Sequence, residues 1–270
     1  MGSCSSRSQS RRVIRPKLLS SAHLGRHTAS KFSMFHGDLE KVKEVYAQWE
    51  TSIHRRMREC YRAVINQEVA AVMDLDLKFV PLDRVGAEHL CLLLPFYDSL
   101  VSLRLWKTRL GPNGCMHLSK ALFSLPQLRT LSIEDNAIGP TGMQSLSQGL
   151  RAVPNLEELY LHANGLQPEG GRVLAALVSY LPRLRSLTVD ENGIKDEAAI
   201  ALIRALSLEK TELRLLGLGY NELTERTAKE MLGTLLKMGT LRKVTFGGAS
   251  VGKELKLELQ NTLPAVTFEF

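Results

Sequence analysis

Leucines recur at a fixed interval over most of the chain. The pattern LxxLxLxxNxL opens at Leu100, Leu128, Leu156, Leu184, Leu213 and Leu241, with spacings of 28 residues and one of 29, and Val72 opens a weaker copy. The alternation in LxL predicts a short strand with one buried face, and the GxxGxxxLxxxL stretch that follows has helical spacing. One unit cannot bury its own leucines, so the pattern predicts stacked parallel strand–helix units, about seven, over residues 72–270.

Asparagine occupies one position of the repeat in register. It stands at Asn136, Asn164, Asn192 and Asn221, and Val80, Thr108 and Ala249 replace it toward the ends. A side-chain amide at a turn can satisfy backbone groups of its own coil and of the next one. We therefore predict a structural role for the four asparagines, as a ladder that joins neighbouring repeats.

The repeat length and the continuation N-x-I/L-G-x-x-G, seen at residues 136–142, resemble the ribonuclease-inhibitor-like leucine-rich repeat family. The resemblance covers about 199 of the 270 residues. It implies an α/β horseshoe solenoid with a parallel sheet on the concave face and helices on the convex face. The family includes ribonuclease inhibitor, the Ran GTPase-activating protein and the sensor arms of NOD-like receptors, which share a scaffold and no single activity.

Residues 38–71 carry apolar side chains at steps of three and four. This spacing predicts an amphipathic helix with Asp38 as its N-cap. The favoured interpretation is a cap over the open core of the first repeat, because solenoid ends need covering. The alternative is a helix that binds a partner.

The positive charge lies in the first 37 residues. They hold seven Lys and Arg and no acidic residue, and the other residues hold 28 basic and 28 acidic side chains. The composition predicts a disordered basic arm over residues 1–37. No basic stripe remains for the folded part, so we expect no nucleic-acid partner.

The N-terminus carries a candidate lipid signal. Met1-Gly2-Ser3-Cys4-Ser5-Ser6 fits the N-myristoylation pattern on Gly2, and Cys4 is placed to take a palmitate. With the basic residues that follow, these acyl chains predict attachment to an anionic membrane surface from the cytoplasm. The alternative is a mitochondrial transit peptide, whose composition is also rich in Arg and Ser and poor in acid.

Two catalytic patterns overlap in residues 247–254. The octet approaches a phosphate-binding loop, but Glu254 stands where Ser or Thr would reach magnesium, and it also contains GxSxG around Ser250. Both patterns fall on the register of the last repeat. The seven His show no HExxH and the four Cys no CxxC, so we expect no enzyme, metal site or cofactor.

The strand residues that alternate with the core positions predict a protein-binding concave face. The candidate contacts are Arg104, Trp106, Glu134, Asp135, Glu158, Tyr160, His162, Asp190 and Glu191, which form an acidic strip beside two aromatic residues. The predicted function is therefore a membrane-tethered scaffold or adaptor for a protein partner with a basic surface. The alternatives are a regulator of a small GTPase and a structural subunit of a large mitochondrial or cytoskeletal assembly.

Overall fold

The computed structural model describes residues 38–208 and 211–270. The predicted acylation sites Gly2 and Cys4, with the whole basic arm, lie outside the described residues. The described part is built on one sheet whose eight strands are all parallel and follow sequence order. The strands are β1 (Asp74–Asp76), β2 (Ser102–Arg104), β3 (Thr130–Ser132), β4 (Glu158–Tyr160), β5 (Ser186–Thr188), β6 (Leu215–Gly217), β7 (Lys243–Thr245) and β8 (Thr267–Glu269).

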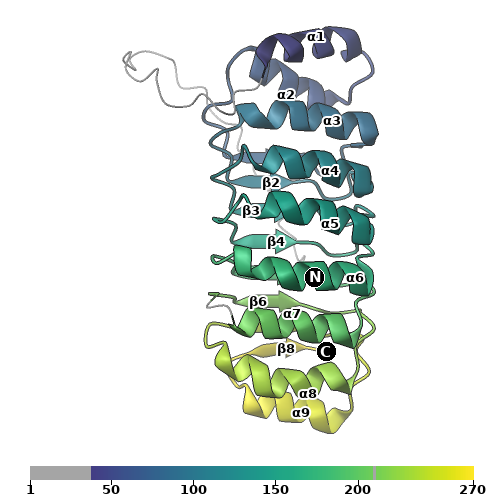
Figure 1. The fold of residues 1–270 in the computed structure, drawn as a ribbon, viewed down its shortest axis with the longest axis vertical. Coiled ribbons are helices and arrows are strands. Elements are labelled where there is room, and N and C mark those ends of the chain that lie inside the picture. The colour runs from purple at the N-terminus through teal and green to yellow at the C-terminus, as the bar shows by residue number, and fades with distance from the viewer. Residues whose placement is uncertain (1–37, 209–210) are drawn as a thin grey trace, which may run out of the picture. The chain divides into compact units, whose positions relative to one another are not determined.

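Helices follow the strands and stack in one layer over one face of the sheet (Figure 1). The α-helices are α1 (Leu39–Trp49), α2 (Arg55–Ile65), α3 (Arg84–Leu93), α4 (Gly111–Leu122), α5 (Gly139–Leu150), α6 (Gln167–Leu177), α7 (Asp196–Leu208), α8 (Glu225–Thr234) and α9 (Lys253–Thr262). Short 3-10 helices extend three of the coils: η1 (Leu94–Phe96), η2 (Val178–Tyr180) and η3 (Leu235–Lys237). The chain therefore forms an α/β leucine-rich repeat solenoid, as the repeat predicted.

The core lies between the sheet and the helix layer. The middle residue of each strand is at most 9% exposed, and these residues pair in register, from Leu75 opposite Leu103 to Val244 opposite Phe268. The leucines that open the repeats pack beside them, and one apolar cluster runs from Val42 to Phe268. Burial of this continuous cluster, which no single coil could achieve, stabilises the stack.

Close helix contact depends on a small residue in α5. A Cβ on Gly149 would lie 2.3 Å from the Ser119 carbonyl oxygen of α4, so only glycine fits. The Gly149 N–H also donates to Ser119 Oγ at 2.9 Å. This contact brings α4 and α5 together in the middle of the layer.

The predicted capping helix is two helices, α1 and α2, with a turn at residues 50–54. The Ser52 and Ile53 N–H groups both donate to the Trp49 carbonyl, which ends α1. The His54 imidazole then accepts from the Arg56 N–H at 3.2 Å and starts α2. A second N-cap inside an apolar pattern of helical spacing divides the segment, because each helix end needs its own partners.

The last strand was not among the seven predicted repeats. β8 begins 24 residues after β7 and has no LxxLxL pattern, but Phe268 is buried at 8% exposure. Phe268 also stacks on Phe270 with ring centroids 5.6 Å apart. These aromatic residues cover the end of the core, where a regular repeat would leave it open.

Candidate interaction face

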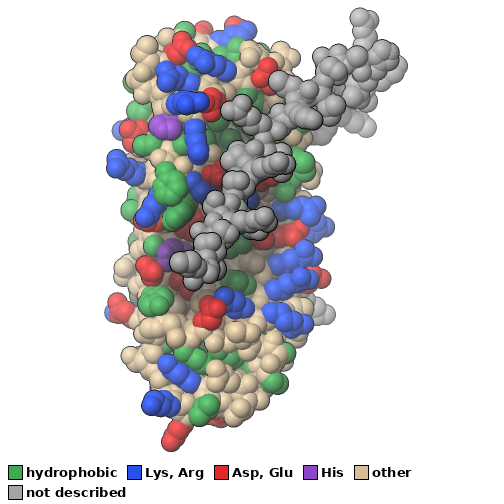
Figure 2. Space-filling model, turned by 180° about the vertical axis from the view of Figure 1, so that it is seen from behind, with side chains coloured by type: hydrophobic (Ala, Val, Ile, Leu, Met, Phe, Trp, Pro, Cys, Tyr) green, Lys and Arg blue, Asp and Glu red, His purple; other side chains and the backbone are tan. Residues whose placement is uncertain are grey.

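The face of the sheet turned away from the helices is here called the strand face, and Figure 2 views it directly. It corresponds to the predicted concave face. The first and third residues of each strand belong to it, because successive side chains of a strand point to opposite faces. The burial pattern of β4 shows this, since Leu159 is buried and Glu158 and Tyr160 are partly exposed.

Beside the strand face, the asparagine ladder closes the turn of each coil. Its members Asn136, Asn164, Asn192 and Asn221 are each at most 5% exposed. Asn164 Oδ1 accepts from the Asn136 N–H of the preceding coil at 2.9 Å. Its Nδ2 donates to the Ile133 and Leu161 carbonyls, both at 2.9 Å. All four amides are thus committed to backbone groups.

Thr108 continues the ladder by one coil. It is fully buried, and its N–H donates to Asn136 Oδ1 at 2.9 Å. Its hydroxyl oxygen lies 2.9 Å from the same Asn136 oxygen. The Thr108 hydroxyl also lies 3.0 Å from the Leu105 carbonyl, to which it can donate. Threonine in place of asparagine at this position therefore keeps part of the hydrogen bonding between neighbouring coils.

The residue before each ladder position has a left-handed backbone. These residues are Phe79 (φ 62°), Lys107 (54°), Asp135 (53°), Ala163 (54°), Glu191 (53°), Tyr220 (54°) and Gly248 (73°). We call them the turn column. Sequence reasoning selected Asp135 and Glu191 from it and missed Phe79, Lys107 and Tyr220. The same register applied to the outer coils could have found them.

The first coils present an aromatic pair, of which Phe79 is exposed and Trp106 partly exposed. Trp106 and Phe79 have ring centroids 4.9 Å apart, and Phe79 is 59% exposed. The Lys107 ammonium lies 5.6 Å from the Trp106 ring centroid and 3.2 Å from Asp135. Predicted contact Arg104 lies 3.7 Å from Asp74 of β1. Trp106 is therefore part of an aromatic and basic cluster of the first three coils.

The predicted acidic strip crosses the central coils. Its five carboxylates are Glu134, Asp135, Glu158, Asp190 and Glu191. Glu158 accepts from the Thr130 hydroxyl at 3.0 Å, Ser132 donates to Glu134, and His162 Nε2 lies 3.8 Å from Glu191. The structure brings the five together on neighbouring coils, with Tyr160 and His162 between them.

Asp190 has an internal role in addition to the predicted one. Its Oδ1 accepts from the Gly219 N–H at 2.8 Å and from the Thr245 hydroxyl two coils away. It reaches Thr245 because Gly217 lies between them, where a Cβ would come within 2.2 Å of Asp190 Oδ2. Asp190 thus joins three coils, and its carboxylate already accepts hydrogen bonds from within the sheet.

Tyr160 is half-buried between acidic neighbours. Burial raises the pKa of its phenol, and the carboxylate of Glu158 raises it further. The hydroxyl stays protonated at neutral pH, and the Glu158 carboxylate is its hydrogen-bond acceptor within the protein.

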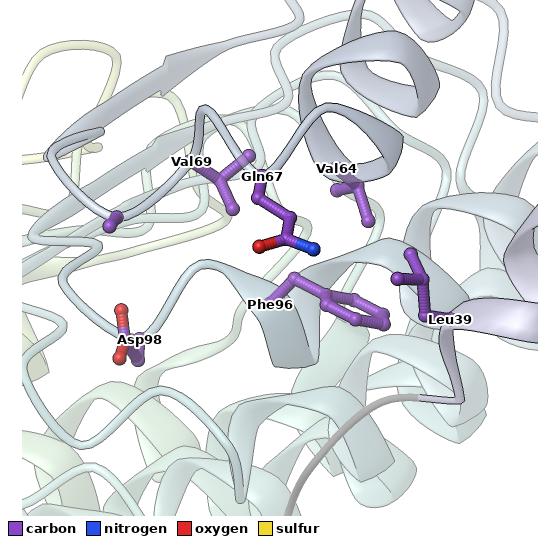
Figure 3. A pocket seen from close by; sticks show the side chains of 7 residues that line it. Leu39, Val64, Gln67, Val69, Phe96 and Asp98 are labelled. Atoms are coloured by element: carbon purple, nitrogen blue, oxygen red, sulfur yellow. The ribbon is translucent and has the colours of Figure 1, made fainter. Parts of the chain in front are cut away.

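A cavity of about 340 Å³ lies apart from the strand face, between the cap and η1 (Figure 3). Leu39, Val64, Val69 and Phe96 give it an apolar lining, and Gln67 and Asp98 add polar groups. None of the predicted site residues lines it.

Within residues 38–208 and 211–270, no three His, Cys, Asp or Glu side chains are grouped to hold a metal ion. Among the described helices, none has the length and apolar character needed to cross a bilayer.

Comparisons with known proteins give one match by sequence. A family described as Leucine Rich repeat matches residues 125–147, which include β3 and most of α5. No curated protein sequence matches the chain.

Several solved structures are similar in fold. A Bacteroides fragilis protein has 14% identity and a TM-score of 0.49, over 83% of this chain and 71% of that one. A leucine-rich repeat protein of Leptospira interrogans has 18% identity and a TM-score of 0.35, over 73% and 60%. TLR13, in its complex with ssRNA13, has 16% identity and a TM-score of 0.38, over 75% and 33%.

Proposed function

We propose that this leucine-rich repeat protein is a non-enzymatic scaffold that binds a protein partner through its strand face and is tethered to a membrane by N-terminal acylation. The observation that carries the proposal is the acidic strip beside the partly exposed Trp106, which packs on the exposed Phe79. Charged residues around exposed aromatic side chains are typical of protein-binding surfaces.

The strip favours a partner that presents Lys or Arg. Asp135 is paired with Lys107 and Asp190 is bonded within the sheet. The negative charges of Glu158 and Glu191 are less neutralised within the protein. Glu158 accepts from a hydroxyl at 3.0 Å, and Glu191 lies 3.8 Å from an imidazole. Complementary charge mainly raises the association rate, and salt screens it over about 8 Å at physiological ionic strength.

The aromatic residues supply the anchoring contacts. Large aromatic side chains dominate the hot spots of protein interfaces, and truncation of one typically costs about 2 kcal/mol or more of binding free energy. Trp106 and Tyr160 stand at two places along the strip, so a bound segment would contact both while its basic groups meet the carboxylates.

A pull-down from native extract tests the binding face. The double variant Trp106→Ala, Tyr160→Ala is compared with wild type and with Met116→Ala, Leu257→Ala, whose residues are exposed on helices α4 and α9. Each protein is first checked by thermal unfolding. We expect the strand-face variant to lose proteins that the control retains. Identical recovery from all three would refute the strand face as the binding surface.

Membrane tethering rests on the sequence of the first residues. A single myristoyl chain binds bilayers with a constant of roughly 10⁴ M⁻¹, so a second signal is needed. Cys4 and the basic residues of the arm are candidates for that second signal, worth about 1 kcal/mol per basic residue near an anionic leaflet.

Mass spectrometry of the protein from its native cells tests the tether. We expect loss of Met1 and a 14-carbon acyl group on Gly2, and release from membranes in Gly2→Ala. A mature N-terminus between about residues 20 and 40 would instead support the mitochondrial alternative.

A further inference from the structure

A second surface lies along one edge of the solenoid, where each helix ends and the chain leads into the next strand. We call it the helix-end edge and define it as residues 123–129, 151–157, 179–185, 208, 211–214 and 236–242. All strands are parallel, so the residues that precede them meet at the same edge. The backbone shows this directly, because the Arg185 N–H donates to the Glu157 carbonyl and the Arg214 N–H to the Arg185 carbonyl.

Arginine precedes four of the strands at this edge. Arg129, Arg185, Arg214 and Arg242 stand directly before β3, β5, β6 and β7. These arginines lie outside the helices, so neutralisation of helix dipoles does not account for them. Figure 2 shows Lys and Arg side chains gathered along one edge of the strand face, over the middle coils.

The helix-end edge has an excess of positive charge, although the balance of 28 basic and 28 acidic residues after residue 37 predicted no basic stripe there. Its residues include seven Lys and Arg but only Glu157 and Glu212 as acids, a net charge of +5. Both acids form ion pairs with arginines of the same edge. Glu157 lies 2.9 Å from Arg129 and 2.8 Å from Arg185, and Glu212 lies 3.1 Å from Arg185. Within the described ranges, no carboxylate lies at ion-pair distance from Arg183 or Arg214.

Exposed apolar side chains accompany the arginines. Phe123, Leu208 and Leu236 occupy the same repeat position near the ends of their helices and are 52%, 82% and 57% exposed. Tyr180, 45% exposed, lies under the Arg151 guanidinium, which is 4.4 Å from its ring centroid. Four of the five coils at this edge thus carry an exposed large apolar side chain, and the same edge carries the cations.

We propose that the helix-end edge docks on an anionic bilayer surface, with Phe123, Leu208 and Leu236 entering the headgroup region and the arginines contacting lipid phosphates. Protein hot spots gather in one desolvated centre, whereas these apolar groups are spread over several coils of an edge that also carries the cations. A fluid anionic surface fits that distribution, because apolar burial and attraction to anionic lipids act together at each coil. Docking would leave the strand face free for a protein.

This inference rests on the proposed membrane location, but it can fail separately from the lipid tether. The full-length chain is produced in bacteria without acylation, so Gly2 contributes no lipid. Its partitioning is measured on vesicles of phosphatidylcholine with about 30% phosphatidylserine, and on phosphatidylcholine alone, by sedimentation at physiological salt.

The charge test compares Arg183→Glu, Arg214→Glu with Arg109→Glu, Lys253→Glu. The control residues follow β2 and begin α9, at the opposite edge, and the two variants change the net charge equally. We expect the edge variant to lose a factor of at least about 25 in partitioning to anionic vesicles, about five for each basic residue removed, because the added carboxylates are repelled as well. The control should lose less than about threefold, because its charges lie beyond the screening length from the docked surface.

The apolar test compares Phe123→Ser, Leu236→Ser with Met116→Ser, Leu257→Ser. The four residues have similar exposures, 52%, 57%, 43% and 58%. We expect about a tenfold loss for the edge variant and little change for its control. If either edge variant partitions like its control, the proposal is overturned, and an acidic protein surface becomes the candidate occupant of the edge.

Discussion

Replacement of Asn164 by alanine should measure how much of the stability of the stack comes from the asparagine ladder. Asn164 is 1% exposed and lies in the middle of the four ladder positions. Alanine would remove the acceptor of the Asn136 N–H at 2.9 Å and the donor to the Ile133 carbonyl at 2.9 Å. The Leu161 carbonyl would keep a partner, because Asn192 Nδ2 also donates to it at 3.0 Å.

Two buried backbone groups therefore lose their partners. Each unsatisfied buried group costs about 1–3 kcal/mol, so we expect the free energy of unfolding to fall by about 3 kcal/mol. For a folded region of this size, that loss corresponds to a decrease of about 6–12 °C in Tm. Urea unfolding followed by circular dichroism measures the first quantity, and a thermal scan measures the second.

Asn155→Ala is the matched control. Asn155 also donates its amide to a carbonyl of the preceding coil, that of Pro126 at 2.9 Å, but this bond is exposed. Water can replace it, and we expect a loss below about 1 kcal/mol. Equal losses for Asn164→Ala and Asn155→Ala would refute the argument that buried backbone groups depend on the ladder.

Three further predictions concern stability and reactivity. Gly217→Ala should destabilise the fold by about 1–2 kcal/mol in urea unfolding, because its Cβ would meet the Asp190 carboxylate at 2.2 Å. Gly233→Ala is the control: a Cβ there would have no neighbouring atom within 4 Å, so this variant should stabilise α8 by about 0.5–1 kcal/mol. Burial raises the pKa of the Cys115 thiol to about 12, so Cys115 should react with a thiol reagent at pH 8 only on unfolding. Peptide mapping that finds Cys115 itself labelled in the native protein at the rate of free cysteine would contradict this. Burial lowers the pKa of His89, so the unfolded state binds its proton more readily and stability should fall as pH drops below about 6.5. His89→Phe should show a smaller loss over that range, and an unchanged pH dependence would rule out His89 as its source.

The fold could be predicted almost entirely from the sequence because its determinants are local and repeated. Each unit carries its own strand, turn and helix signals, and one spacing of 28 residues sets the register of the whole stack. The helical spacing of residues 38–71 predicted the cap, but not its division into two helices at residues 50–54. The strand β8 was also missed, because the LxxLxL pattern does not extend to Phe268.

The interaction face could be predicted only in part. The period of two along a strand identified Glu158 and Tyr160 as outward residues, and the turn column explains why Phe79 and Tyr220 belong beside them. The sequence alone could not show that Asp190 bonds to Thr245, because that contact depends on the missing side chain of Gly217 between them.

The sequence by itself determined that the leucines of the repeat are buried, and it determined where the excess charge of the whole chain lies. Only the tertiary structure decided which exposed residues become neighbours. Phe123 and Leu236 are 113 positions apart and reach one edge because parallel coils stack in register. Side chains at equivalent repeat positions are distant along the chain and aligned in space, so a surface of this protein exists only when its coils are stacked.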